Sequence, residues 1–359
     1  MASPPGTTSK PGHVRGLDTW RLIAAIWVVL SHFNIPPLVV GRDSSDWMVH
    51  AITTFQGILF NGPAAVVVFF IISGFCIHYP IAAGNDFDAP QFLVRRFLRI
   101  GLPLFAVVCI SPMVGLRFEV LDRMAIWSLF CELIYYALYP AFRFVLRHVS
   151  WRVLLGCTFA LALMVPLSEL DHASRSEVNR TWGDYPSFGI LKNSLLGLPC
   201  WLLGARLAQW WTQQLSSGTS PDTDDKLWQW RLGIWALSSI ALVIRFHSPI
   251  GYPWTLNLFG IACYFWLQRE LVHFAKVNPP SILEWGGTWS YSIYLVHPVT
   301  QAAWLGFALG ASLPPLASWA MLMLATAVAS YAFYRVVEAP SHSAAKAAAR
   351  LMRTPLVSR

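Results

Sequence analysis

Ten apolar runs, each about as long as a bilayer is thick, constrain this chain more than any other feature. A membrane-spanning helix needs about 20 mostly apolar residues. Runs of this kind lie at residues 17–38, 55–80, 98–116, 124–146, 151–168, 187–210, 228–246, 252–271, 285–308 and 315–337. Prolines inside them, such as Pro103 and Pro199, are tolerated where neighbouring helices cover the freed carbonyls. The sequence therefore predicts an all-α, polytopic integral membrane bundle of about ten helices.

The composition excludes a soluble globular protein, a disordered chain and a disulfide scaffold. Only 12% of the residues are charged and 55% are hydrophobic, whereas a soluble domain carries about 25% charged residues. The cysteines stand singly in apolar stretches without metal-ligand or redox spacing, so they predict buried thiols and no metal site. These residues are Cys76, Cys109, Cys131, Cys157, Cys200 and Cys263.

The positive charges predict the orientation of the bundle. Ten spans put both termini on one side, and cytoplasmic loops of membrane proteins are enriched in Lys and Arg. With the N-terminus inside, 18 of the 26 Lys and Arg residues lie in inside segments and seven in outside segments. The sequence thus predicts an N-in, C-in topology. The formal net charge of +8 is attributed to this topology and not to binding of nucleic acid.

The chain divides into one membrane domain and two short ends. Residues 1–16 are rich in Pro, Ser, Thr and Gly, and we expect a disordered cytoplasmic segment there and no cleaved signal peptide. Residues 17–338 form the predicted membrane domain, and residues 339–359 a basic cytoplasmic tail. The run SHSAAKAAAR in that tail is typical of a short amphipathic helix, with a frayed end as the alternative.

Ionisable groups inside spans are costly, and this makes the first span informative. It carries Arg21 and His32, which are eleven residues apart. Eleven helical steps amount to three turns plus about 20°, so the two side chains share a face and lie about 16 Å apart along the axis. Each could also be an interface residue, with Arg21 snorkelling to the headgroups.

Two later spans carry further polar residues. In WSLFCELIYYALYP, Ser128, Glu132, Tyr135 and Tyr139 fall at helical spacing and predict one polar stripe. Placing a carboxylate in mid-membrane costs free energy that helix packing alone does not explain, so Glu132 is a candidate functional residue. In WSYSIYLVHP, the residues Tyr291, Tyr294 and His297 recur every three positions and roughly share a face.

Two segments near the predicted cytoplasmic face complete the candidate set. The row QFLVRRFLRIGLP holds Arg95, Arg96 and Arg99, which fit either a positive-inside anchor or a phosphate clamp. In FFIISGF, Ser73 and Gly74 are small enough for close helix packing or for a gap that faces a ligand. Acids, bases and cations that converge inside a bundle suit group transfer or a proton-coupled transporter.

These motifs together resemble the membrane-bound acyltransferase family 3. The first span resembles that family's Gly-Leu-Asp start followed by an arginine and a histidine, here Asp18, Arg21 and His32. The segments FFIISGF, QFLVRRFLRIGLP, WSLFCELIYYALYP and WSYSIYLVHP resemble its later motifs, in the family's order and over most of the chain.

The resemblance implies an integral membrane O-acyltransferase. Such an enzyme moves an acyl group, commonly acetyl and sometimes succinyl, from cytoplasmic acyl-CoA to a hydroxyl of a surface or exported carbohydrate. It implies catalytic roles for His32, Glu132 and Arg21, binding of acyl-CoA near Arg95, Arg96, Arg99, Ser73 and Gly74, and substrate contacts from Tyr135, Tyr291, Tyr294 and His297. Whether His32 is a base or is itself acylated stays open, and Glu132 is expected either to orient the histidine or to balance Arg21.

The expected partners follow from the same resemblance. They are acyl-CoA as co-substrate, a carbohydrate or lipid-linked glycan acceptor, the lipid bilayer, and proteins of glycan synthesis or export, with no permanently bound cofactor and no metal. A bacterial inner membrane is the expected location. Two alternatives remain: a proton-coupled exporter of a small metabolite, and a non-catalytic assembly partner.

Overall fold

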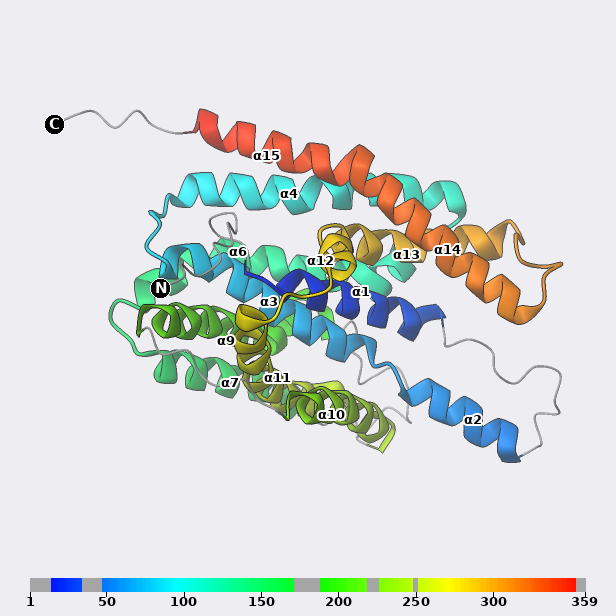
Figure 1. Cartoon of the computed structure of the whole chain (residues 1–359), viewed down its shortest axis with the longest axis horizontal. Coiled ribbons are helices and arrows are strands. Elements are labelled where there is room, and N and C mark those ends of the chain that lie inside the picture. Colours follow the sequence, from blue (N-terminus) through cyan, green and yellow to red (C-terminus); the bar gives the residue numbers. More distant parts are fainter. Residues whose placement is uncertain (1–13, 34–46, 171–187, 218–225, 248–250, 353–359) are drawn as a thin grey trace, which may run out of the picture.

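A computed structural model describes residues 14–33, 47–170, 188–217, 226–247 and 251–352. Within these ranges the chain is helical with short connections and contains no strand. Most of the longer helices run side by side, roughly along the longest axis of the molecule (Figure 1). The predicted disordered segment lies largely outside the described residues.

The helices follow the predicted runs, with differences at their ends. The longer ones are α1 Leu17–Phe33, α2 Trp47–Ile58, α3 Gly62–Ala82, α4 Ala89–Ile110, α6 Trp127–Val145, α7 Trp151–Ser168, α9 Gly189–Ser217, α10 Leu227–His247, α11 Tyr252–Lys276, α13 Ser290–Gly306, α14 Pro315–Phe333 and α15 Ala339–Leu351. Shorter segments are η1 Ser111–Val114, α5 Phe118–Leu121, η2 Asp122–Ile126, α12 Ser281–Gly287 and η4 Tyr334–Glu338.

Two predicted spans are divided in the structure. The run 55–80 breaks between α2 and α3, where Asn61 caps α3 by accepting a hydrogen bond from the backbone of Ala64. The run 285–308 breaks between α12 and α13, beside Gly287, where an added Cβ would lie 2.0 Å from the Asp18 carbonyl oxygen. Hydropathy alone missed both breaks because a capping residue or a close backbone contact interrupts a helix without reducing apolar content.

The whole arginine row lies inside a helix, whereas the predicted run 98–116 includes only Arg99 of the three. Helix α4 begins at Ala89, nine residues earlier than that run, because Asp88 caps it and Pro90 occupies its first turn. The row is therefore held on a regular helix. Its side chains consequently point in directions fixed by the helical repeat.

Helices α3 and α9 pack with their backbones in close contact. A Cβ added at Gly74 would lie 1.9 Å from the Trp201 carbonyl oxygen, and one added at Gly204 would lie 1.9 Å from that of Ile71. Small residues of this kind let two backbones approach in membrane bundles. Around this contact the buried side chains of α1, α3, α6, α9 and α11 form one continuous core.

The C-terminal helices wrap one side of the bundle. Helix α14 continues through the π-helical η4 into α15, which lies beside α4 (Figure 1). Residues 339–351 of the predicted tail are thus helical and packed. This brings Glu338, at the start of α15, next to the helix that carries the arginine row.

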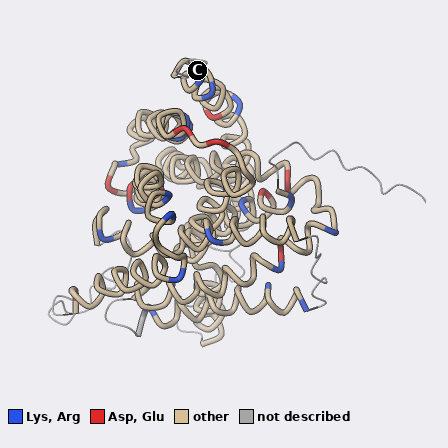
Figure 2. Tube along the Cα trace, turned by 90° about the vertical axis from the view of Figure 1, so that its left-hand side faces the viewer, with Lys and Arg blue, Asp and Glu red and all other residues tan. Residues whose placement is uncertain are grey.

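The structure supports a multi-pass membrane protein. Six helical stretches of the described chain are long and apolar enough to cross a bilayer: Trp47–Ala82, Ala89–Val114, Phe118–Val145, Trp151–Ser168, Leu227–Arg245 and Pro315–Leu351. Charged residues are sparse along the trace, as Figure 2 shows. The count of ten spans and the N-in, C-in topology stay predictions.

Candidate active site

A cavity of about 120 Å³ lies among α1, α3, α4, α6, the α12–α13 junction and η4. We call it the arginine cavity because Arg21, Arg96 and Arg99 line it. Its other polar lining residues are Ser73, Cys76, Ser128, Glu132, Tyr136, Thr288, Ser290, Tyr291, Tyr294 and Glu338. It therefore gathers residues from most of the sequence motifs.

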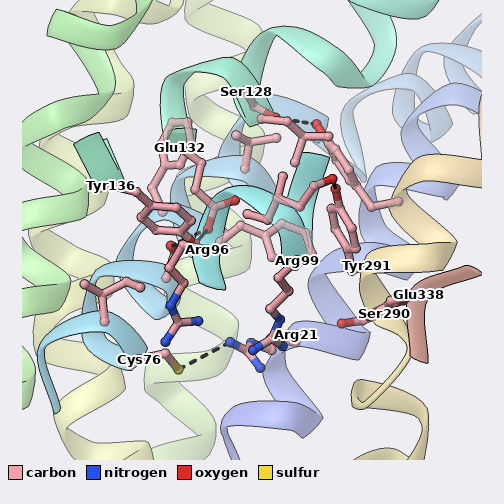
Figure 3. Close-up of a pocket in the computed structure, with 18 of the residues that line it drawn as sticks. Arg21, Cys76, Arg96, Arg99, Ser128, Glu132, Tyr136, Ser290, Tyr291 and Glu338 are labelled. Carbon is pink, nitrogen blue, oxygen red and sulfur yellow. Dashed lines mark hydrogen bonds between the residues drawn. The ribbon is translucent and has the colours of Figure 1, made fainter. Parts of the chain in front are cut away.

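The three guanidinium groups come together on one side of this cavity (Figure 3). Arg21 forms an ion pair with Asp18 at 3.0 Å and donates a hydrogen bond to the Cys76 sulfur at 3.3 Å. The Nε of Arg96 is buried and has no hydrogen-bond partner within the described part of the chain. Because a buried donor without a partner is costly, this arrangement is suited to an anionic ligand.

Glu132 is held by hydroxyl groups of the same cavity. Its Oε1 accepts short hydrogen bonds from the hydroxyls of Ser73 and Tyr136. Ser73 in turn accepts a hydrogen bond from the indole of Trp201 at 3.2 Å. Glu132 is thus fixed by α3, α6 and α9, and these contacts do not include a histidine.

Glu338 places a second carboxylate in the arginine cavity. Its Oε2 accepts a hydrogen bond from the Ser292 hydroxyl at 2.5 Å, and its Oε1 lies 3.5 Å from Nε2 of His342. Three arginines and two carboxylates line the cavity, so its formal charge is positive by one unit when all five are ionised.

Ser128 and Tyr294 line the cavity from α6 and α13. The Tyr294 hydroxyl lies 2.7 Å from the Ser128 hydroxyl and donates to the Ala125 carbonyl at 3.1 Å. Tyr291, one turn earlier on α13, donates to the Ile100 carbonyl at 2.9 Å. Tyr294 also neighbours His297, with 6.0 Å between their ring centroids.

His32 lies in a second cavity, of about 340 Å³, which we call the histidine cavity. Met124 of η2 lines the same cavity. The ring of His32 stacks on the ring of His297, with 5.2 Å between centroids. Val66 lines both cavities, so they adjoin each other.

His297 is fully buried between the two cavities. Its Nδ1 lies 2.8 Å from the Tyr294 carbonyl oxygen, which can only accept, so Nδ1 carries a proton. Its Nε2 has no hydrogen-bond partner among the residues described. A polar line therefore runs from the arginines through Tyr294 and His297 to His32.

Three of the predicted site residues lie elsewhere. Arg95 is exposed and does not line the arginine cavity. Tyr135 is fully buried and donates its hydroxyl hydrogen to the Ser194 carbonyl at 2.8 Å, whereas Tyr136 faces the cavity. Gly74 contacts the α9 backbone, so its small size serves helix packing in this structure.

Several site residues carried no specific sequence signal. Cys76 and Tyr136 are ordinary residues of apolar helices until the fold brings them beside Arg21 and Glu132. Met124, which lines the same cavity as His32, likewise carried no specific signal in the sequence. Among the described residues, no group of three or more His, Cys, Asp and Glu side chains is arranged to hold a metal ion.

Comparison with known proteins gives one strong match. The model of an acyltransferase domain, that of acyltransferase family 3, matches residues 14–335, nearly the whole chain of 359 residues. No curated protein and no solved structure matched the chain. The matched range contains every residue that lines the histidine cavity and all but Glu338 of those that line the arginine cavity. The chain belongs to acyltransferase family 3, a family of membrane acyltransferases.

Proposed function

We propose that this protein transfers an acyl group, acetyl in the first instance, from acyl-CoA to a hydroxyl of a surface or exported carbohydrate. The observation that supports the proposal is the clustering of Arg21, Arg96 and Arg99 in one cavity, which shares the lining residue Val66 with the cavity of His32. CoA is a polyanion, and arginine matches phosphate oxygens in a forked geometry. The predicted N-in orientation puts these arginines near the cytoplasmic side, where acyl-CoA is made.

The dimensions of α1 support a donor that extends from one cavity to the other. Arg21 and His32 lie about 16 Å apart along the helix axis. With the CoA phosphates at the arginines, the pantetheine arm would run past Ser128 and Tyr294 and bring the thioester towards His32. Glu132 and Glu338 would limit the net positive charge of the cavity, so that product CoA can leave.

His32 would act as the general base. Its ring lines the histidine cavity and is positioned by stacking on the ring of His297, so a ring nitrogen could take the proton of an acceptor in that cavity. The acceptor oxygen attacks the thioester carbonyl and its proton passes to His32. The C–S bond then breaks, and the thiolate of CoA takes up a proton as it leaves. The location that fits this chemistry is a bacterial inner membrane, with partners in glycan synthesis or export.

The first experiment is binding of radiolabelled acetyl-CoA to the purified protein in nanodiscs. We expect saturable binding that Arg99→Gln weakens by about tenfold or more, because a charge-assisted phosphate contact is lost. The matched control is Arg95→Gln, on the same helix but exposed outside the cavity. This variant is expected to bind as the unmodified protein does.

The outcomes separate the candidate functions. Transfer of label to a glycan acceptor supports the acyltransferase. Equal weakening by both substitutions would contradict the placement of the donor phosphates. Absence of binding by any acyl-CoA would favour the proton-coupled exporter, which would use the same buried carboxylates and histidines as a relay.

A further inference from the structure

The end of α1 that carries His32 lacks part of its own helical support. His32 is the last residue but one of α1, which ends at Phe33. In a continuing helix the carbonyls of His32 and Phe33 would accept hydrogen bonds from the N–H groups of residues 36 and 37. Both of these residues are prolines, which have no N–H. The last carbonyls of α1 therefore need partners from elsewhere.

Helix α13 supplies such a partner from a distant part of the sequence. The side-chain amide of Gln301 donates a hydrogen bond through its Nε2 to the carbonyl oxygen of His32, at 3.1 Å. The two residues are 269 positions apart in the chain, and Gln301 is half-buried. This contact closes the end of α1 as a capping residue would, but from a neighbouring helix. It acts on the backbone of the residue whose side chain is the proposed base.

His297 lies one helical turn before Gln301 and contacts the side chain of His32. Residues four positions apart share a face of a helix. The His297 ring stacks on that of His32 with 30° between the two planes, and its centroid lies 6.1 Å from that of Phe33. His297 is itself fixed, because it is fully buried and its Nδ1 lies 2.8 Å from the Tyr294 carbonyl oxygen. One face of α13 thus contacts both the backbone and the imidazole of the base.

Other contacts keep α13 in place without Gln301. The hydroxyl of Thr300 lies 2.9 Å from that of Thr326 on α14. The hydroxyl of Tyr294 donates to the carbonyl of Ala125 in η2 at 3.1 Å. Helix α13 is therefore anchored to two further elements. Removal of the Gln301 amide is expected to loosen the end of α1 and to leave α13 where it is.

We infer that Gln301 is a positioning residue for the general base. It holds the His32 carbonyl, and with it the point from which the ring reaches into the histidine cavity, while His297 fixes the plane of that ring. Gln301 is not among the described residues that line either cavity, so it acts through His32 and not on a ligand. The inference rests on the proposed function, in which His32 takes the proton of the acceptor hydroxyl.

The test compares Gln301→Leu and Gln301→Glu with the unmodified full-length protein in nanodiscs. Leucine has no donor, and glutamate keeps the shape but as a carboxylate only accepts. The probes are acetyl-CoA labelled in the acetyl group and membranes of the organism that makes the protein, which supply the acceptor. We expect kcat for label transfer to fall by about tenfold in both variants, because a displacement of about 1 Å can cost up to about 10²-fold in rate. The KM and the equilibrium binding of acetyl-CoA should stay unchanged.

Two further variants separate positioning from packing. The matched control is Ser318→Ala, because the indole of Trp304 on α13 donates to the Ser318 hydroxyl of α14 at 3.2 Å. This substitution also removes one hydrogen bond between α13 and another helix, but not the one to α1, so kcat should be unchanged. The second variant combines Gln301→Leu with His32→Ala. If Gln301 acts through His32, the double variant transfers label at the same residual rate as His32→Ala alone.

Each outcome decides. An unchanged kcat in the Gln301 variants, or a further loss of rate in the double variant, would overturn the positioning role and leave the acyltransferase standing. A parallel loss of acetyl-CoA binding would also overturn it, because the amide would then serve the packing of the whole bundle. Absence of both acetyl-CoA binding and labelled product with the unmodified protein would overturn the proposed function itself. A selective fall in kcat that depends on His32 supports the inference.

Discussion

The arginine cavity and the histidine cavity differ in how their charged groups are held. In the arginine cavity, Arg21 is paired with Asp18 and Glu132 is fixed by two hydroxyls, within a narrow space. In the histidine cavity, Arg123 and Arg245 border a wider space, and no Asp or Glu among the described residues lines it. The comparison shows a narrow cavity that is lined by arginines and carboxylates beside a wider cavity that holds His32.

The two cavities are joined by polar groups of α13. Tyr294 lines the arginine cavity, and its neighbour His297 stacks on His32 in the other. A reaction between ligands from the two sides would therefore take place near the end of α1 that carries His32. Donor binding in one cavity and proton removal in the other are separate proposals. Each can be tested by a single substitution.

The largest expected effect is that of His32→Ala on acyl transfer. General-base catalysis contributes about 10²–10⁴-fold, and we expect a loss of this size in the rate of label transfer to acceptor. Binding of acetyl-CoA in the arginine cavity should persist, because His32 does not line it. Transfer at the unmodified rate would contradict the role of His32 as the base.

The substitution Gly74→Ala tests whether Gly74 serves the packing of α3 on α9 or the binding of a ligand. The added Cβ would lie 1.9 Å from the Trp201 carbonyl oxygen, a distance that forces α3 away from α9. We expect a drop of about tenfold in the yield of folded protein from detergent, because the cost of steric overpacking reaches several kcal/mol. The measurement is size-exclusion chromatography of the extracted protein.

The control for that substitution is Gly101→Ala. Gly101 is also in a helix, but an added Cβ there meets nothing within 4 Å. Its yield should equal that of the unmodified protein. A well-folded Gly74→Ala variant with weakened acyl-CoA binding would instead indicate that Gly74 faces a ligand.

Periodicity predicted the helices and much of the polar line, but not which neighbour each face meets. From Ser128, Tyr135 lies about 20° to one side and Tyr136 about 80° to the other. Spacing favours Tyr135, yet the cavity lies on the side of Glu132 and Tyr136, while Tyr135 turns to Ser194 of α9. Only the positions of α3, α4 and α9 decide between them.

The arginine row and Gly74 also show that the sequence alone does not determine which neighbour a side chain faces. Arg95, Arg96 and Arg99 look equivalent as a sequence, but the helical repeat turns Arg95 outward once α4 is packed. Gly74 fits a ligand gap or a helix contact equally well until α9 is in place. The histidine cavity was not predicted beyond His32, because Arg123 and Arg245 come from distant segments.

The smallest expected effect is that of Glu132→Gln, and its direction is informative. The amide keeps the oxygen that accepts hydrogen bonds from Ser73 and Tyr136 but loses the negative charge beside three arginines. Binding of CoA should therefore become tighter by a few-fold, because like-charge repulsion of the phosphates is reduced. The turnover number should fall by a similar factor if product CoA then leaves more slowly. Equilibrium binding and single-turnover transfer would be measured together. Weaker binding of CoA would show that Glu132 holds the donor directly, and the contrast between the two cavities would have to be redrawn.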